Sequence, residues 1–483
     1  MDVRDMIRMS RGFHVLDKDL GRVTHAEAAQ RHAFRPVWRL GLAMLLLVAG
    51  LVAAMGAGAG EPALTGLVAG LVVAGWLGLA IGSNDVANSL GPAVGAGAIR
   101  LFPGLVLVAL AEIAGASLAG DAVTSRLAHG IFDTELLVSG GQTAPTIMLS
   151  ALLGAAVWIT AATGVGLPVS TSHSIVGGIA GAGVAALGGQ AVHWSTLGMI
   201  ASAWMIAPLV AAALAGMLVI LIRQRVLEAP DRGAAATRWL PPLVGVMTGG
   251  FAAYLVLLAR MYLDPALALP VGVIAGGVGL AMMRRIVATE IAQSGDRPGG
   301  KRLFRPVLLV AVVIMGFAHG ANDVANVAGP LSVILSNGGD TLSPVPITAL
   351  LLAGLAIALG TLLFGRRLVV MVGSGITRLN AGRAFCVSLA TAVTVLTASS
   401  FGLPVSTTHV AIGGIFGVGF AREWLDRRAA RARSPLPAEE SRRRLLIRRS
   451  HVATISAAWI VTVPATGFLG AMCCLLILRV TGG

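Results

Sequence analysis

Long apolar stretches alternate with short polar connections along the whole chain of 483 residues. Each apolar stretch is about 20 residues long, the length at which a helix spans the hydrocarbon layer of a bilayer. The strand-length alternation of polar and apolar residues that is typical of an outer-membrane barrel is not visible. The pattern predicts membrane-spanning helices at residues 39–56, 63–82, 101–119, 143–163, 195–222, 239–259, 265–283, 306–325, 345–364, 384–402 and 452–478.

The composition agrees with an all-α polytopic membrane protein. Hydrophobic residues make up 56% of the chain and charged residues only 12%, which leaves too little polar surface for a soluble fold of this length. The net charge of +14 would suggest nucleic acid as the partner of a soluble protein, but here the basic excess lies in the connections between apolar stretches. The positive-inside rule explains that excess without nucleic acid, and it places residues 1–39, 222–238, 284–305 and 421–450 in the cytoplasm.

Two short sequence motifs occur twice. The first motif is GSNDVAN at residues 82–88, and it returns as GANDVAN at 320–326. The second motif is PVSTSH at residues 168–173, and it returns as PVSTTH at 404–409. The two offsets, 238 and 236 residues, nearly agree, so a whole half of the protein is duplicated. A duplicated membrane domain is typical of secondary transporters.

The two halves are predicted to cross the membrane in opposite directions. Two cytoplasmic connections must be separated by an even number of membrane crossings. By this count the first half begins on the outside of the membrane and the second half begins on the inside. Residues 120–131 match residues 365–376 at a constant offset of 245, and the first loop with its flanks is acidic whereas the second is basic. The fold class expected is therefore an inverted-topology repeat with broken and re-entrant helices and about 12–13 membrane segments.

This topology divides the chain into five parts. They are a cytoplasmic tail at 1–38, an extra transmembrane helix at 39–61, the first repeat at 62–222, a basic linker with two transmembrane helices at 223–304, and the second repeat at 305–480 with the basic loop 421–450.

The first motif places an acid between amides inside an apolar segment. Asn84, Asp85 and Asn88 stand at i, i+1 and i+4, and Asp323 is the corresponding acid of the second copy. An ionisable residue at this depth is costly, so both acids are candidates for binding a co-transported cation or a proton. The alternative is a structural carboxylate that caps a helix, and the symmetrical recurrence favours function. The Gly-Pro pairs that follow, at 91–92 and 329–330, are predicted to break both helices.

The second motif is predicted to start a helix in each half. A proline followed by successive hydroxyls leaves backbone N–H groups and side-chain donors directed at one point, where the positive end of the helix dipole attracts an anion. Two such starts that face each other would bind a tetrahedral oxyanion. The alternative is ordinary capping of two re-entrant helices.

Together these motifs resemble the inorganic phosphate transporter (PiT) family. The match spans residues 63–480, both motifs occur in both halves in the family's order, and residues 158–173 read like the family's own sequence. Trp204 with Pro208, and Trp459 with Pro464, extend the resemblance to the last helix of each half. The resemblance implies secondary transport of inorganic phosphate, which is bound between the two halves.

The resemblance also implies roles for individual residues. Those that would contact phosphate are Asn84, Asn88, Ser170, Thr171, Ser172, Asn322, Asn326, Ser406, Thr407 and Thr408. Those that would carry the coupling ion or proton are Asp85, Asp323 and Glu112, and a buried, paired Glu112 without function is the alternative for the last.

Three histidines and one serine also bear on these roles. His319 precedes the second copy of the first motif, where it is either a proton relay or phosphate ligand or a satisfied core histidine. His173 and His409 are expected to hold the two re-entrant helices in place. Ser388 stands where many sodium-coupled members have an acid or an amide, which weakens the case for sodium.

The function expected is a symporter that imports phosphate, with a proton as coupling ion and free phosphate or a metal–phosphate complex as cargo. A sodium-coupled symporter and a sulfate permease on the same scaffold are the alternatives, and a passive anion channel or a membrane enzyme fits the sequence less well. The cysteines, at 386, 473 and 474, lie in apolar runs without paired spacing, so neither a disulfide framework nor a metal site is indicated. No cofactor is expected. The expected location is the bacterial plasma (inner) membrane with a cytoplasmic N-terminus, and the resemblance allows a homodimer.

Overall fold

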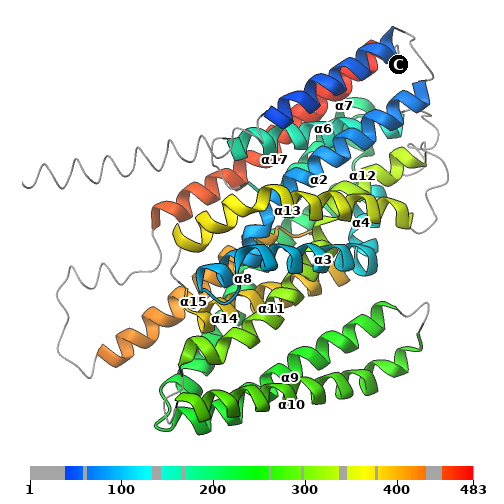
Figure 1. The fold of residues 1–483 in the computed structure, drawn as a ribbon. Coiled ribbons are helices and arrows are strands. Elements are labelled where there is room, and N and C mark those ends of the chain that lie inside the picture. The colour runs from blue at the N-terminus through cyan, green and yellow to red at the C-terminus, as the bar shows by residue number, and fades with distance from the viewer. Residues whose placement is uncertain are drawn as a thin grey trace, which may run out of the picture.

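The computed structural model of the protein describes residues 39–57, 62–132, 143–164, 169–259, 263–294, 299–336, 345–375, 379–430 and 449–481. In these ranges the chain forms a bundle of long helices, most of which run side by side (Figure 1). The predicted tail 1–38 and residues 431–448 of the predicted loop 421–450 lie outside the described residues. The helices are Arg39–Gly56, α2 (Pro62–Gly95), α3 (Leu101–Ala119), α4 (Asp121–His129), α6 (Thr143–Gly164), α7 (Thr171–Leu187), α8 (Trp194–Ile222), α9 (Arg232–Leu258), α10 (Ala268–Ser294), α11 (Gly300–Asp323), α12 (Ala325–Leu335), α13 (Ile347–Gly375), α14 (Ala381–Ser400), α15 (Thr407–Ala430) and α17 (Arg449–Thr481).

The helices have the length and the composition of membrane spans. Within the described residues, 11 of them are long and apolar enough to cross a bilayer, and each predicted apolar window falls on one of these. The apolar helix α7 is shorter, at 17 residues, and α15 carries charged residues in its C-terminal half. The prediction of an all-α polytopic membrane protein is confirmed.

The predicted helix breaks at the two Gly-Pro pairs are wrong. Helix α2 continues through Pro92 to Gly95, and Pro330 lies inside α12. A proline in a helix forfeits the hydrogen bond of its own missing N–H, and a membrane helix tolerates this loss where its neighbours pack around it. In the second half the chain is interrupted earlier, at Val324 between α11 and α12. Asp323 therefore ends a helix, whereas Asp85 lies inside one.

Two apolar clusters fill the interior, and each combines helices from both halves of the sequence. One cluster joins α2, α6 and α7 of the first half to α12 and α13 of the second. The other joins α3 and α8 to α11 and α14. Because the halves pack crosswise in this way, the repeated motifs of one half lie against helices of the other.

Glycines set the two helix crossings next to these motifs. Gly320 in α11 leaves no room for a β-carbon against the backbone of Glu112 in α3. At the corresponding crossing, Gly82 in α2 leaves none against the backbone of Ile357 in α13. Small residues that allow backbones to approach this closely are a common means of packing helices in membranes.

Helices α9 and α10 form a hairpin at the edge of the bundle (Figure 1). The two helices meet at glycines, and a β-carbon on Gly249 would lie 2.6 Å from the carbonyl oxygen of Gly272. This hairpin falls within the predicted linker, and none of its described residues bonds to the side chains of the repeated motifs.

Candidate functional site

Asp85 lies in α2 at the centre of the first motif, and its side chain is fully buried. Its Oδ1 accepts hydrogen bonds from the amides of Asn84, at 3.1 Å, and Asn88, at 3.4 Å. Two hydroxyls complete the set: Thr408 donates to Oδ1 at 3.1 Å and Thr171 to Oδ2 at 3.2 Å. The carboxylate of one half is thus held by hydroxyls from both halves.

Asp323 has a closely similar environment in the second half. Its Oδ1 accepts from the amides of Asn322, at 2.9 Å, and Asn326, at 3.3 Å. Its Oδ2 accepts from the Thr407 hydroxyl at 3.0 Å and lies 2.8 Å from Nε2 of His319. All of these side chains are buried. The histidine is the one contact without a counterpart among those described for Asp85.

The second motif starts a helix in each half, as predicted. Helix α7 begins at Thr171, and the Ser170 hydroxyl accepts from the backbone N–H of His173 at 3.2 Å. Helix α15 begins at Thr407, and the Ser406 hydroxyl accepts from the N–H of His409 at 3.3 Å. The positive dipole ends of both helices therefore lie beside the buried carboxylates.

Removal of either cap tests this geometry. We expect Ser170→Ala and Ser406→Ala each to lower the stability of the protein by about 1 kcal/mol, because an N-terminal N–H loses its acceptor. Ser→Asn at the same positions restores an acceptor and is the matched control. The thermal midpoint of the purified protein in detergent measures the effect. Equal midpoints for the Ala and Asn variants would contradict the capping role.

Side chains of the two halves also bond directly to each other. The Asn88 amide donates to the Thr408 hydroxyl at 2.8 Å, and in the mirrored contact the Asn326 amide donates to the Ser172 hydroxyl at 3.4 Å. Ser172 in turn donates to the carbonyl oxygen of Val405 at 3.0 Å. Each first motif is thus joined to the second motif of the opposite half.

Glu112 approaches the site through a histidine. It is fully buried in α3, and its Oε1 lies 2.7 Å from Nδ1 of His319. Its Oε2 accepts from the Thr361 hydroxyl at 2.8 Å. Thr361 was not among the predicted residues, since a lone threonine in an apolar run carries no signal in one sequence.

The other two histidines pack beside the site. The ring of His173 lies 3.8 Å from the Trp204 ring and 4.5 Å from that of His409, measured between centroids. The Trp204 indole donates to the carbonyl oxygen of Pro404 at 2.9 Å, which joins α8 to the start of the second motif. These contacts agree with a packing role for both histidines.

The predicted residues form one connected group, which is buried except at Asn84, Asn88 and Thr408, where it is half-buried. Asp85, His319 and Asp323 each offer an oxygen or nitrogen within 4.8 Å of the others, which is close enough for an ion. However, the carboxylate oxygens already accept hydrogen bonds from amides and hydroxyls. The amide of Asn322 is also engaged, since it donates to the carbonyl oxygen of Val405 at 2.6 Å and accepts from the N–H of the same residue at 3.1 Å.

The family follows from a comparison with known proteins. A family model described as "Phosphate transporter family" matches residues 81–470, a range that includes both copies of both motifs. The chain belongs to this family. It is therefore a phosphate transporter and not an enzyme, as the sequence predicted.

Curated relatives of this phosphate transporter cover most of the chain. A protein of Helicobacter pylori (strain ATCC 700392 / 26695) named "Putative phosphate permease" is 37% identical over 424 residues, which are 86% of this chain and 79% of that protein. "Inorganic phosphate transporter 2-1, chloroplastic" of Arabidopsis thaliana is 32% identical over 418 residues, 80% of this chain and 67% of that protein.

A solved structure shares the fold of the transporter. It is the structure named "The sodium-dependent phosphate transporter", and it superposes with a TM-score of 0.76 at 29% identity, covering 86% of this chain and 99% of its own. The helical bundle is therefore that of a phosphate transporter.

Proposed function

We propose that this phosphate transporter is a symporter that imports inorganic phosphate together with protons by alternating access. The observation that carries the proposal is the meeting of two capped helix N-termini, those of α7 and α15, at one buried group with two carboxylates. N–H groups and hydroxyls at helix starts are suitable donors for a tetrahedral oxyanion. By this proposal the ten hydroxyl and amide side chains expected from the sequence surround the phosphate.

The charge of the site is the reason for proposing coupled transport. Among the described residues in contact with Asp85 and Asp323 there is no lysine or arginine, and the basic group present is the imidazole of His319 beside Asp323. An anion about 4 Å from an ionised carboxylate is repelled by about 4 kcal/mol at an effective dielectric constant of about 20. Phosphate therefore needs accompanying positive charge in order to bind here, and a proton on a carboxylate supplies it.

The hydroxyls connect phosphate binding to the protonation of the carboxylates. In the structure Thr171 and Thr408 donate to Asp85, and Thr407 donates to Asp323. Hydroxyls rotate freely, so bound phosphate can take these donors. A buried carboxylate that loses its donors is costly as an anion and takes up a proton instead. Phosphate and proton binding then favour each other.

Alternating access would rest on two halves of opposite orientation. The glycine crossings Gly82 with Ile357 and Gly320 with Glu112 lie at corresponding positions of the two halves, which supports a repeat. The charges of the loops predict that the second half is inverted relative to the first. The proposal includes this inversion and the five predicted parts of the chain.

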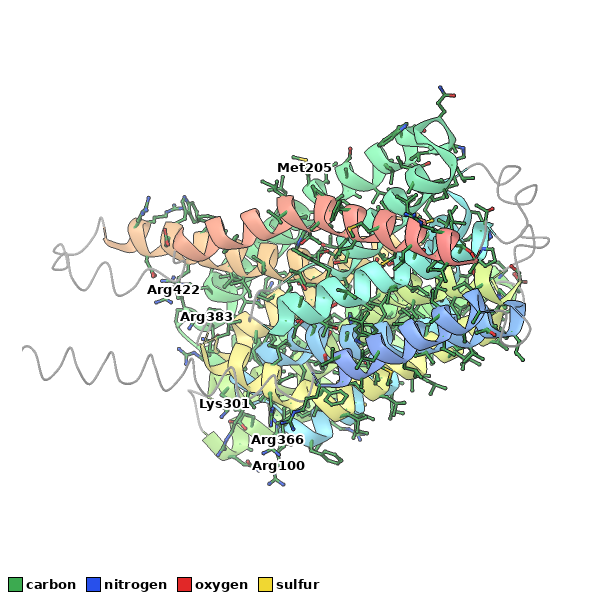
Figure 2. The ribbon with its side chains drawn as sticks, turned by 90° about the horizontal axis from the view of Figure 1, so that it is seen from above. Arg100, Met205, Lys301, Arg366, Arg383 and Arg422 are labelled. Atoms are coloured by element: carbon green, nitrogen blue, oxygen red, sulfur yellow. The ribbon has the colours of Figure 1, made fainter. Side chains whose placement is uncertain are left out.

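The proposed orientation in the plasma membrane, with a cytoplasmic N-terminus, is supported by basic connections that lie at the same end of the helical bundle. Arg223, in the connection after α8, pairs with Asp426 near the end of α15 at 2.7 Å, so two of the basic segments meet. Figure 2 shows Lys301, Arg366 and Arg422 toward one end of the bundle. Positive charge on one side is typical of cytoplasmic loops.

Uptake of radiolabelled phosphate into proteoliposomes that contain the purified full chain tests the proposal. We expect an inward proton gradient to drive accumulation and a sodium gradient at constant pH to leave it unchanged. Excess arsenate should compete and excess sulfate should not, whereas competition by sulfate would indicate a sulfate permease.

The same assay separates the remaining candidates. Sodium coupling is the second candidate, because the similar solved structure is that of a transporter named as sodium-dependent. Accumulation driven by sodium alone would favour it and would contradict proton coupling. Uptake that responds to neither gradient would indicate a passive channel. A parallel series with and without Mg²⁺, with the metal content of the vesicles measured, decides whether the cargo is phosphate or a metal–phosphate complex.

A further inference from the structure

Three buried ionisable side chains lie next to one another in a row that leads into the site. The imidazole of His319 lies between two carboxylates. Its Nδ1 is hydrogen-bonded to Oε1 of Glu112 at 2.7 Å, whereas Nε2 lies 2.8 Å from Oδ2 of Asp323 in a close contact that lacks the alignment of a hydrogen bond. All three side chains are fully buried. The Thr361 hydroxyl, at 2.8 Å from Oε2, holds the Glu112 carboxylate in this orientation. Among the described residues, no hydrogen bond joins Glu112 to the hydroxyls of the proposed phosphate site, so its connection to the site passes through His319.

This row of ionisable side chains has no counterpart at the corresponding positions of the other repeat. The offset of 238 between the first motifs pairs His319 with Ile81, and the offset of 245 between the following helices pairs Glu112 with Ile357. The structure agrees with this pairing, because Gly320 packs on the backbone of Glu112 as Gly82 packs on that of Ile357. Ile81 and Ile357 are both fully buried. The position that mirrors the ionisable pair is therefore apolar.

The two site carboxylates consequently differ. Asp85 accepts hydrogen bonds from two amides and two hydroxyls, none of which passes on a proton at moderate cost. Asp323 has the same kinds of donor, and in addition its Oδ2 lies 2.8 Å from Nε2 of the His319 imidazole. Among the described residues, the ionisable groups that interact electrostatically with His319 are Glu112 of α3, Asp323 of its own helix and Asp85 of α2.

We propose that Glu112, His319 and Asp323 are the path by which the coupling proton reaches and leaves the phosphate site, and that Asp323 rather than Asp85 is the carboxylate it loads. This proposal rests on the proposed proton symport. Imidazole can accept a proton at one nitrogen while it donates from the other. Nδ1 takes the proton of the Glu112 carboxyl group, and the N–H at Nε2 gives its proton to Oδ2 of Asp323.

The transfer is balanced and reversible. Glu112 becomes a carboxylate, Asp323 becomes a carboxylic acid, and the imidazole is again neutral with its proton now on Nδ1. The return of that proton to Glu112, once Asp323 has released its own proton to Nε2, resets the path. In the loaded state Oδ2 of Asp323 no longer needs the Thr407 hydroxyl, which is then available to phosphate.

The variants Glu112→Gln and His319→Gln, singly and combined, test the path in proteoliposomes of the full chain. Two readouts are compared. The first is exchange of internal for external labelled phosphate at equal pH, in which the proton can stay on Asp323. The second is the initial rate of net uptake driven by an inward proton gradient, with a pH dye inside the vesicles to follow the protons. We expect exchange to remain within about 3-fold of the original protein, since Gln keeps one polar contact at each position. The rate of net uptake should fall at least about 10-fold, because it requires Asp323 to be loaded and unloaded in every cycle. In the double variant it should fall no further than in either single one, because two steps of one path are not additive.

The controls separate this inference from the proposed function. Ile357→Leu alters packing at the mirrored position and should leave both readouts unchanged. A melting curve in detergent shows whether each variant is folded, and where His319→Gln does not fold, Glu112→Gln alone decides. An unchanged rate of net uptake in a folded Glu112→Gln variant, or a further loss in the double variant, overturns the path. Uptake by the original protein without any proton movement contradicts proton symport itself, whatever the variants do.

Discussion

Asp85→Asn and Asp323→Asn are each expected to reduce gradient-driven phosphate accumulation by about 10- to 100-fold, because a hydrogen bond to a charged group contributes about 1.5–3 kcal/mol and every 1.4 kcal/mol is a factor of ten. The amide is nearly the same size as the carboxylate, so the helix packing is retained. It replaces an oxygen that accepts from hydroxyls with a nitrogen that accepts nothing. The Thr171 hydroxyl at Asp85 and the Thr407 hydroxyl at Asp323 then compete with an N–H group for the same space.

The measurement is initial uptake of labelled phosphate by equal amounts of reconstituted protein under an imposed proton gradient. Asp121→Asn is the matched control, since Asp121 is an exposed acid in the first turn of α4 and the same substitution there should leave uptake unchanged. Gel filtration in detergent establishes that each variant is folded. Full accumulation by either site variant would remove that carboxylate from the mechanism.

The sequence predicts which of these side chains come together because they belong to repeated motifs. Asn88 and Asn326 bond to hydroxyls of the opposite half in mirrored contacts, as two facing copies of one arrangement should. The helix starts at Thr171 and Thr407 also follow from local rules, since a serine before the first turn supplies the missing acceptor. Local capping chemistry and duplication are both readable in a single chain.

The features that the sequence does not predict depend on packing between distant helices. Pro92 remains inside α2 because its neighbours support the helix, which no local pattern shows. The contact of Glu112 with His319 joins residues 207 positions apart and has no counterpart in the other half, so duplication gives no hint of it. Thr361 enters the site for the same reason, through the crossing of α13 with α2 and α3.

The second prediction with a large expected effect concerns the glycines where α3 crosses α11 and α2 crosses α13. We expect Gly320→Ala and Gly82→Ala to destabilise the protein by about 3 kcal/mol, the upper end of the usual cost of overpacking, because the added methyl group would overlap with backbone atoms of the facing helix, which cannot rotate away. The overlap is with the backbone of Glu112 in the first case and of Ile357 in the second. A shift of α3 away from α11 would also lengthen the contact between Glu112 and His319, so Gly320→Ala should impair transport in any protein that still folds.

Gly75→Ala is the control for this prediction, because Gly75 lies in α2, two turns before Gly82, and a β-carbon there would meet no atom within 4 Å. Alanine is the better helix former by about 1 kcal/mol, so the control should be neutral or slightly stabilising. The thermal midpoint in detergent, followed by gel filtration, compares the three variants. Midpoints of Gly82→Ala and Gly320→Ala equal to that of Gly75→Ala would mean that the facing helices can separate at little cost. The site would then owe its geometry to the hydrogen bonds between the halves and not to the close approach of α2 to α13 and of α3 to α11.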